Sequence, residues 1–302
     1  MYIQNHQVTF PKNRVSLDTD FSKLYISSFK GQIYKKILGF ESISVVEEEK
    51  LFDLFYDNIK QIKSDENESV LLIITHTSPN ISTYFNGISK KICRKIQLDN
   101  NYVFGLSSNR CVSFFDALKI ALLYLNNKVV TKVLIITGDI AFTKELRVIN
   151  DVAIAGDAVS SIIFSNSGEH NQLIDCKTIT RGEFASGVWL QGENKKFYEK
   201  NYISIMKDLI FSLLDRNGLN LEQINWIIPH NVNKMSWLNF IKEINYPESK
   251  IILENISQHG HCFASDLIIN YKTMTPFLQP GDYYLFVSAG LGGTFGTALF
   301  KH

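Results

Sequence analysis

The sequence carries almost no excess of charge. Its 302 residues include 31 Lys and Arg against 30 Asp and Glu, so the formal net charge is +1. A balanced charge gives no electrostatic case for nucleic acid or an anionic membrane surface as a partner. Long hydrophobic runs are also missing. The longest, such as residues 132–137, have the length of a strand and are too short to span a bilayer.

Cysteine is equally scarce. The chain has four, Cys93, Cys111, Cys176 and Cys262, which are far apart and form neither a CxxC pair nor the spacing of zinc ligands. Residues 1–7 lack a basic segment followed by an apolar one, so we expect no secretory signal. These absences predict a cytoplasmic, reduced protein without a metal or a cofactor.

What is present is the pattern of a layered α/β protein. Hydrophobic residues make up 45% of the chain, enough for a globular core. The expected elements of the first half are a strand at 70–74, a helix from Cys111 to about Leu125, and strands at 133–136 and 158–164. The polar stretch 166–171 predicts a boundary between two halves, residues 1–165 and 166–302.

The second half repeats the order of the first. Its expected elements are a helix at 196–214, a strand at 224–228, a helix through Trp237 and Ile241, a turn at 259–261 that opens another helix, and a strand at 283–288. Equivalent positions keep a nearly constant separation: 154 residues from His76 to His230, and 150 from Cys111 to His261 and from Ile135 to Leu285. This spacing predicts an internal duplication with buried sheets.

Cys111 is the candidate nucleophile. It follows a short polar turn at 107–110 and opens an amphipathic helix. A thiol at a helix N-terminus lies where unpaired backbone N–H groups favour the thiolate, which is the reactive form. Free cysteines are also among the most buried residues, so an inert core cysteine is the alternative.

Other reactive side chains are expected at the strand-to-loop ends of the second half. His230, Asn233, His261 and Asp266 all follow or flank predicted strands there, where loops carry functional groups on a rigid base. Acyl transfer requires a thiolate, N–H groups for the oxyanion and a histidine that manages protons. The glycine-rich segment 290–296 can supply the N–H groups, or can simply be a turn between two strands.

Read in order, these motifs resemble the thiolase-fold condensing enzymes, in particular the ketoacyl-ACP synthase III branch. The resemblance is carried by segments 75–79, 155–158, 190–192 with Phe197, 228–233 and 290–296, together with Cys111. It implies a five-layered α-β-α-β-α fold built from two duplicated halves. It also implies a homodimer, a substrate carried as acyl-CoA or on acyl carrier protein, and an acyl-cysteine site at the end of a tunnel.

The third catalytic position departs from that pattern. His261 stands where the synthase III branch has asparagine, and Asp266 follows five residues later. A carboxylate can orient a histidine as a base, and this pair resembles the thiolase-fold acyltransferases of specialised metabolism. Because positions five apart on a helix point about 140° apart, the pairing requires His261 to precede the helix. Otherwise Asp266 caps the helix or faces solvent.

Three further features are less regular. Arg110 replaces the small residue usual before the nucleophile; it is a candidate for favouring the thiolate or binding an acidic substrate group, or for a structural ion pair. Lys234 is a candidate contact for an acidic carrier protein. Residues 1–68 have no sharp motif, and the segment around Pro11 is expected to replace the family's first strand.

The leading hypothesis is an acyltransferase of specialised or fatty-acid-related metabolism. Cys111 would take the acyl group, and the Cys111 and Gly292 N–H groups would hold the oxyanion. His261, oriented by Asp266, would deprotonate a hydroxyl, amine or thiol acceptor.

In this scheme His230 and Asn233 would stabilise the thioester carbonyl or position pantetheine. A second hypothesis is a decarboxylating ketoacyl synthase that uses His230 and His261 on a malonyl thioester. A third is a non-catalytic partner subunit of a heterodimer.

Overall fold

One mixed sheet forms the frame of the protein. The computed structural model describes residues 1–24, 26–46, 51–60, 69–77, 88–95, 102–149, 152–290 and 292–302. Nine strands follow one another across the sheet, in the order β11 (Ile224–Pro229), β12 (Tyr283–Gly290), β13 (Thr294–Lys301), β10 (Gln172–Thr180), β1 (Tyr2–Thr9), β9 (Ala158–Ser165), β6 (Lys132–Asp139), β4 (Val70–Thr75) and β5 (Val103–Leu106).

The two halves of this sheet have the same pairing. In the first half β4 is parallel to β6, β6 is antiparallel to β9, and β9 is antiparallel to β1. In the second half β11, β12, β13 and β10 repeat these relations. Ile251, which forms a parallel bridge to Ile227, takes the place that β5 has beside β4. The predicted duplication is therefore confirmed in the topology.

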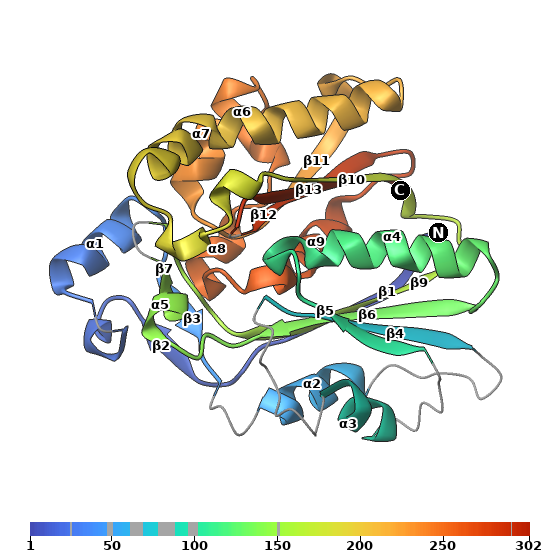
Figure 1. Ribbon diagram of the computed structural model, residues 1–302, viewed down its shortest axis with the longest axis horizontal. Coiled ribbons are helices and arrows are strands. Elements are labelled where there is room, and N and C mark those ends of the chain that lie inside the picture. The colour runs from blue at the N-terminus through green and yellow to red at the C-terminus, as the bar shows by residue number, and fades with distance from the viewer. Residues whose placement is uncertain are drawn as a thin grey trace.

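Helices complete five layers, visible in Figure 1. Two outer helices cover the first half, α2 (Leu51–Ile59) and α3 (Ile88–Lys95), and two cover the second, α6 (Gly192–Arg216) and α7 (Lys234–Glu243). Between the two parts of the sheet lie α4 (Ser113–Asn126) and α9 (Asp266–Met274). The α-β-α-β-α fold expected from the resemblance is confirmed.

The central helices are buried because they are apolar on more than one face. Phe114, Phe115 and Leu118 of α4 are fully buried, as are Leu267 and Ile268 of α9. They share one core cluster with the inner faces of β4, β6 and β12. Burying one such side chain stabilises the fold by roughly 1.5–3 kcal/mol. The many buried side chains of the middle layer therefore stabilise the packing of the two halves against each other.

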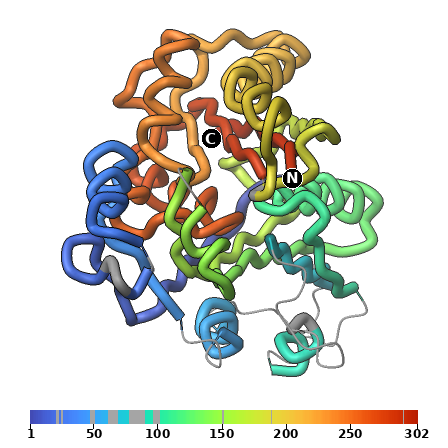
Figure 2. The backbone as a smooth tube through the Cα atoms, turned by 60° about the vertical axis from the view of Figure 1, so that its left-hand side comes forward, coloured from blue at the N-terminus to red at the C-terminus, as the bar shows by residue number. Residues whose placement is uncertain are grey.

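Short elements from residues 14–44 lie against the second half. They are β2 (Arg14–Ser16), α1 (Ser28–Lys36) and β3 (Ser42–Ser44). Figure 2 shows this blue segment beside the orange α7 and α8 (Glu254–His259). The Lys234 N–H donates to the Leu38 carbonyl oxygen at 3.0 Å, and the Glu41 N–H donates to that of Ser257 at 3.0 Å.

The expectation for the N-terminus was wrong. Residues Tyr2–Thr9 form β1, an eight-residue strand in the middle of the sheet, paired with β9 and β10. The strand was missed because polar residues interrupt its apolar alternation: only Ile3 and Val8 within it are buried. None of the helices in the described part of the chain has the length and apolarity to cross a membrane.

Candidate active site

Cys111 lies in a 3-10 turn, Arg110–Val112, that leads directly into α4. The α-helix itself begins two residues later than predicted, because Arg110 adopts a left-handed conformation with φ of 55°. Cys111 is only 1% exposed. Its Sγ lies 3.6 Å from Nε2 of His261 and 3.5 Å from Oγ1 of Thr77. The thiol therefore faces the imidazole that the sequence predicted.

The turn at Gly260, between α8 and α9, positions His261. Gly260 has φ of 70°, and a side-chain carbon there would lie 2.6 Å from the Ile154 carbonyl oxygen. The His261 N–H donates to that same oxygen at 2.9 Å, and the Gly156 N–H donates to the His261 carbonyl oxygen at 3.0 Å. A backbone bridge to the first half thus holds the histidine in front of Cys111.

Asp266 lies behind His261 and is completely buried. Its Oδ2 lies 2.5 Å from Nδ1 of His261 and accepts the N–H of Asn231 at 2.7 Å; its Oδ1 accepts the N–H of Cys262 at 2.7 Å. A 3-10 turn, Phe263–Ser265, separates the histidine from α9. The geometric condition for the pairing is met, and Asp266 does not face solvent.

The two cavity histidines have opposite charge preferences. Burial by itself would lower the pKa of His261, but the charge and hydrogen bond of Asp266 outweigh it and raise the pKa to about 10. Burial, together with repulsion from His261, lowers the pKa of His230 to about 3. Their ring centroids are 5.9 Å apart. At neutral pH one ring is therefore a cation and the other a neutral donor.

His230 and Asn233 lie where β11 ends and α7 begins. The His230 N–H donates to the Val287 carbonyl oxygen at 3.0 Å, and its own carbonyl oxygen accepts Nε1–H of Trp237 at 2.7 Å. Asn233 caps α7, because its Oδ1 accepts the Ser236 N–H at 2.7 Å. Much of the hydrogen-bonding capacity of Asn233 is thus used to hold this loop.

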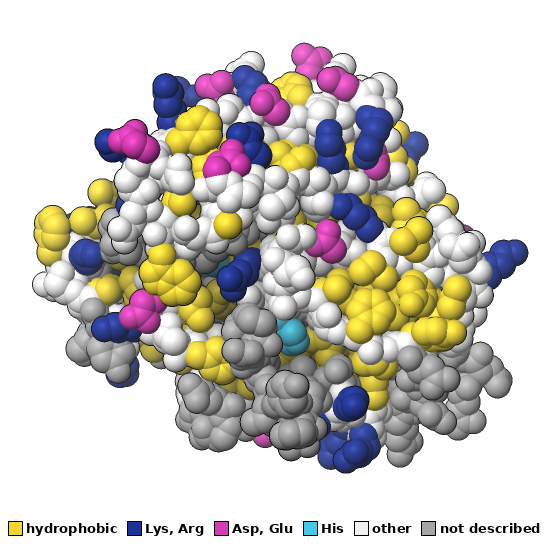
Figure 3. All heavy atoms as spheres, in the orientation of Figure 1, with side chains coloured by type: hydrophobic (Ala, Val, Ile, Leu, Met, Phe, Trp, Pro, Cys, Tyr) yellow, Lys and Arg dark blue, Asp and Glu magenta, His cyan; other side chains and the backbone are white. Residues whose placement is uncertain are grey.

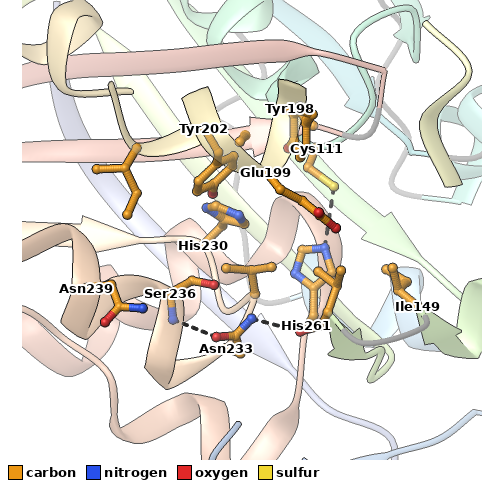
Figure 4. Close-up of a pocket in the computed structure, with 15 residues that line it drawn as sticks. Cys111, Ile149, Tyr198, Glu199, Tyr202, His230, Asn233, Ser236, Asn239 and His261 are labelled. Atoms are coloured by element: carbon orange, nitrogen blue, oxygen red, sulfur yellow. Dashed lines mark hydrogen bonds between the residues drawn. The ribbon is translucent and has the colours of Figure 1, made fainter. Parts of the chain in front are cut away.

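A cavity of about 310 Å³ opens in front of these residues. Cys111, His230 and His261 border it, with Tyr198, Glu199 and Tyr202 of α6 on one side and Asn233, Ser236 and Asn239 on another. Figure 4 shows Cys111 and His261 facing each other, with His230 beside Tyr202. The remaining described lining residues are mostly apolar: Ile149, Val152, Ile203, Val232, Ala289 and Gly290. The cavity suits a slender, partly polar ligand that ends at the sulfur.

Three residues predicted to bind substrate are not among the described lining residues of this cavity: Arg110, Gly292 and Lys234. Nη1 of Arg110 donates to the Thr77 carbonyl oxygen at 3.2 Å. Gly290 rather than Gly292 borders the cavity, and the stem of Lys234 packs over Gly39. Residues 78, 79 and 291 of the predicted motifs lie outside the described part of the chain.

The aromatic wall from α6 was not predicted as part of the site. Tyr202 and Ile203 belong to the helix predicted at 196–214, and helical spacing does not distinguish a core from a cavity wall. Tyr202 has a buried hydroxyl without a hydrogen-bond partner among the described residues. A polar tip on an apolar helix face is the signal that could have indicated the cavity.

Comparisons with known proteins agree with this fold. A family model for the C-terminal part of 3-oxoacyl-[acyl-carrier-protein] synthase III matches residues 214–302. Beta-ketoacyl-[acyl-carrier-protein] synthase III 2 of Bacteroides thetaiotaomicron is 22% identical over 268 residues, covering 80% of this chain and 78% of that protein. The structure of 3-oxoacyl-[acyl-carrier-protein] synthase III from Aquifex aeolicus VF5 has a TM-score of 0.82 at 18% identity, covering 100% of this chain and 99% of that one. The acyltransferase ChlB3 has a TM-score of 0.82 at 16% identity, covering 99% and 97%.

The fold and the matching regions define a thiolase-fold protein. Within that class, the sequence and the structure of the chain are similar to those of ketoacyl-ACP synthase III proteins, in line with the resemblance carried by its motifs. The likeness to these relatives supports an enzyme.

Proposed function

We propose that the chain is an acyltransferase that passes an acyl group from a pantetheine thioester, through Cys111, to a hydroxyl, amine or thiol acceptor. The observation that carries the proposal is the line of hydrogen-bonded groups from Cys111 through His261 to Asp266 at the end of the cavity. A nucleophile, a base and an orienting carboxylate are the parts that acyl transfer requires.

In the first step the Cys111 thiolate attacks the thioester carbonyl carbon. The His261 imidazolium, 3.6 Å from the sulfur, stabilises the negative charge before attack. When the tetrahedral intermediate collapses, the carbon–sulfur bond to pantetheine breaks and the leaving thiolate takes the proton from His261. The products are acyl-Cys111, a free pantetheine thiol and a neutral His261.

In the second step neutral His261 removes a proton from the acceptor, which attacks the acyl-cysteine carbonyl. Cys111 leaves as a thiolate, and His261 is again a cation. Asp266 stabilises this cation through the 2.5 Å contact at Nδ1. The proton count closes without a metal or any cofactor other than the pantetheine on the substrate.

The neutral ring of His230 would donate a hydrogen bond to the thioester carbonyl, and the Cys111 N–H would contribute to the oxyanion site. Asn233 would contact pantetheine with the part of its amide that does not hold the loop. The roles of Gly292 as a second oxyanion donor and of Arg110 as a contact for an acidic substrate group remain predictions, as does the cytoplasmic location.

Decarboxylating condensation is the second candidate. Two histidines border the same cavity with their ring centroids 5.9 Å apart, so both can bind one malonyl thioester carbonyl. The relatives named as ketoacyl synthases favour this reaction. The buried Asp266, however, supplies an orienting carboxylate that favours the acyltransferase.

We also propose that two copies associate through the β5 edge of the sheet. β5 ends the row of described strands, and edge strands expose backbone groups that can pair with another chain. Apolar side chains gather on this side of the molecule beside α4, as Figure 3 shows. Exposed hydrophobic residues close in sequence to β5 and α4 are Tyr102, Leu123 and Val129. Light scattering of the purified protein should therefore give twice the chain mass.

Intact-mass spectrometry after incubation with a panel of acyl-CoAs, and with the same acyl groups on carrier proteins, tests the proposal. We expect an acyl-sized mass increase in the wild type and none in Cys111→Ala. Addition of an acceptor should then remove the adduct and yield the acylated acceptor. Absence of an adduct with every donor would leave the non-catalytic partner subunit as the better reading.

A malonyl group separates the two catalytic candidates. A malonyl adduct that stays intact favours acyl transfer. Loss of carbon dioxide with formation of a new carbon–carbon bond would instead identify the condensing enzyme.

A further inference from the structure

A chain of buried amides lies behind the catalytic residues. Asn270 is on α9, four residues after Asp266, so the two side chains share one face of the helix. Asn270 is completely buried. Its Nδ2 donates to the Pro229 carbonyl oxygen and to Oδ1 of Asn231, both at 2.7 Å. Its Oδ1 accepts Nδ2 of Asn255 at 2.8 Å. With both N–H groups and the oxygen engaged, the amide has one fixed orientation.

The two groups that Asn270 holds stand on either side of His230. One of them, Asn231, also donates its backbone N–H to Oδ2 of Asp266, the oxygen that lies 2.5 Å from His261 Nδ1. A single side chain is thus connected to both histidines. It reaches His230 through the loop and His261 through the Asn231 N–H and Asp266.

The residues next to Asn270 along α9 are apolar. Its neighbours Leu267, Ile269 and Tyr271 on α9 are buried hydrophobic residues. A buried amide stabilises a fold less than an apolar side chain of the same size would, unless it pairs with buried polar groups. Such groups need a partner, because leaving one of them unpaired costs roughly 1–3 kcal/mol. The Asn270 amide contacts the chain at the end of β11, where the loop turns toward the cavity, and this position indicates a role in the site.

We propose that Asn270 is a positioning residue for the reaction, which holds the 229–231 loop so that His230 and the Asp266–His261 pair keep their places relative to Cys111. The proposal rests on the proposed function in that it takes Cys111 and His261 as the reacting pair. Asn270 contacts no reacting atom itself.

Alkylation of Cys111 by iodoacetamide tests this without knowledge of the acyl substrate. The rate is followed between pH 5 and 10 by peptide mass spectrometry, which distinguishes Cys111 from the other cysteines. The titratable groups that face His261 are Asp266, Cys111 and His230. In Asn270→Leu we expect the rate at pH 7 to fall about 10- to 100-fold, by analogy with the loss of a residue that hydrogen-bonds a metal-binding histidine from behind. We also expect the rise of the rate with pH to move to higher pH, because Asp266, held less firmly against His261, stabilises the cation beside the thiolate less.

Asn58 provides the matched control. It is likewise completely buried, and its Nδ2 donates to Oγ1 of Thr9 and to the Val159 carbonyl oxygen, both at 3.0 Å. Asn58→Leu should lower the melting temperature in a similar way, yet leave Cys111 alkylation within about twofold of wild type at every pH. Equal alkylation profiles for Asn270→Leu, Asn58→Leu and wild type would refute the positioning role.

Asn231→Ala is a milder second variant, in case Asn270→Leu does not fold. It removes the side-chain amide of Asn231, whose oxygen accepts from Asn270, but keeps the backbone N–H that donates to Asp266, and should slow alkylation in the same direction by a smaller factor. A wild-type rate and profile in this variant would also overturn the proposal. If wild-type Cys111 is alkylated but accepts no acyl group from any thioester, the proposed function fails while the positioning result still stands.

Discussion

The two halves of the molecule share a topology but divide the chemistry unequally. In each half a 3-10 turn precedes the central helix, and a non-glycine residue with φ of 55° begins that turn: Arg110 in the first half and Phe263 in the second. The first turn carries Cys111, and His261 lies just before the second. Duplication therefore brought the two turns together, with one reactive side chain inside its turn and the other just before its turn.

Beyond that point the halves differ. Of the described lining residues of the cavity, only Cys111, Ile149 and Val152 belong to the first half. The second half supplies both histidines, the buried carboxylate and the wall from α6, a helix of 25 residues. The first half thus carries the nucleophile, Cys111. The second half carries the charged groups that act on its sulfur and most of the cavity wall past which a substrate reaches it. Substitutions in the second half should accordingly change the chemistry most.

The largest expected effect is that of Asp266→Asn. A neutral amide neither stabilises the His261 cation nor fixes its tautomer, so acyl transfer should slow by about 10³- to 10⁴-fold. Single-turnover kinetics with the preferred acyl thioester measures this. Thr77→Val, which removes a 3.5 Å contact to the sulfur from the first half, should slow transfer less than about tenfold. Retained activity in Asp266→Asn, with release of carbon dioxide from a malonyl thioester, would favour the condensing enzyme.

Next in size is the effect of His230→Gln. Loss of the neutral ring removes a donor to the thioester carbonyl, and losing one oxyanion donor costs about 10²- to 10³-fold in rate. We expect the loss in formation of the acyl-cysteine, measured by rapid-quench mass spectrometry. Transfer from a preformed adduct should fall less than formation does, because His261 and Asp266 remain. Equal loss in both steps would contradict a role for His230 that is confined to formation of the acyl-cysteine.

The features that depend on residues close together in the chain, or on their order along it, could be predicted from the sequence. Apolar runs predicted β4, β6, β9, β11 and β12 but gave no bounds for β5, β10 or β13, and a nearly constant separation of about 150 residues predicted the duplication. The pairing of His261 with Asp266 was predictable because it needs only a turn before the helix, which Gly260 supplies.

Features set by packing were not predictable. β1 was missed because its central position in the sheet depends on β9 and β10 rather than on its own polar sequence. The direction of the Lys234 side chain depends on Gly39, which is far away in the sequence. Tyr202 lies on a helix whose apolar spacing suits a core as well as a cavity wall.

A smaller effect concerns stability and pH. The folded-state pKa of His261 is raised from 6.5 to about 10, so its contribution to the free energy of unfolding is complete below about pH 6.5 and is lost as pH rises toward 10. The pKa of His230 in the folded state is lowered to about 3. As pH falls below about 6.5, His230 therefore takes up a proton in the unfolded chain but not in the folded one, and the free energy of unfolding decreases.

Urea unfolding at pH 6.5 and 9.5 measures the first of these contributions. Wild type should lose on the order of a few kcal/mol between the two values, and Asp266→Asn should lose less. The same alkaline loss in wild type and Asp266→Asn would mean that the pair does not couple as the structure indicates.

The smallest expected effect is that of Lys234→Ala, at the contact between the halves. The Lys234 N–H is bonded to Leu38 of the first half, and that bond survives the substitution. The side chain is not among the described lining residues of the cavity, so acyl transfer from acyl-CoA should stay within about twofold of wild type. If Lys234 contacts an acidic carrier protein, the KM for the acyl carrier should rise severalfold while that for acyl-CoA is unchanged, since an exposed ion pair contributes about 0–1 kcal/mol. An equal rise in KM for both donors would instead place Lys234 at the entrance used by pantetheine. The residues of the second half that determine access to Cys111 would then include one at the contact between the two halves.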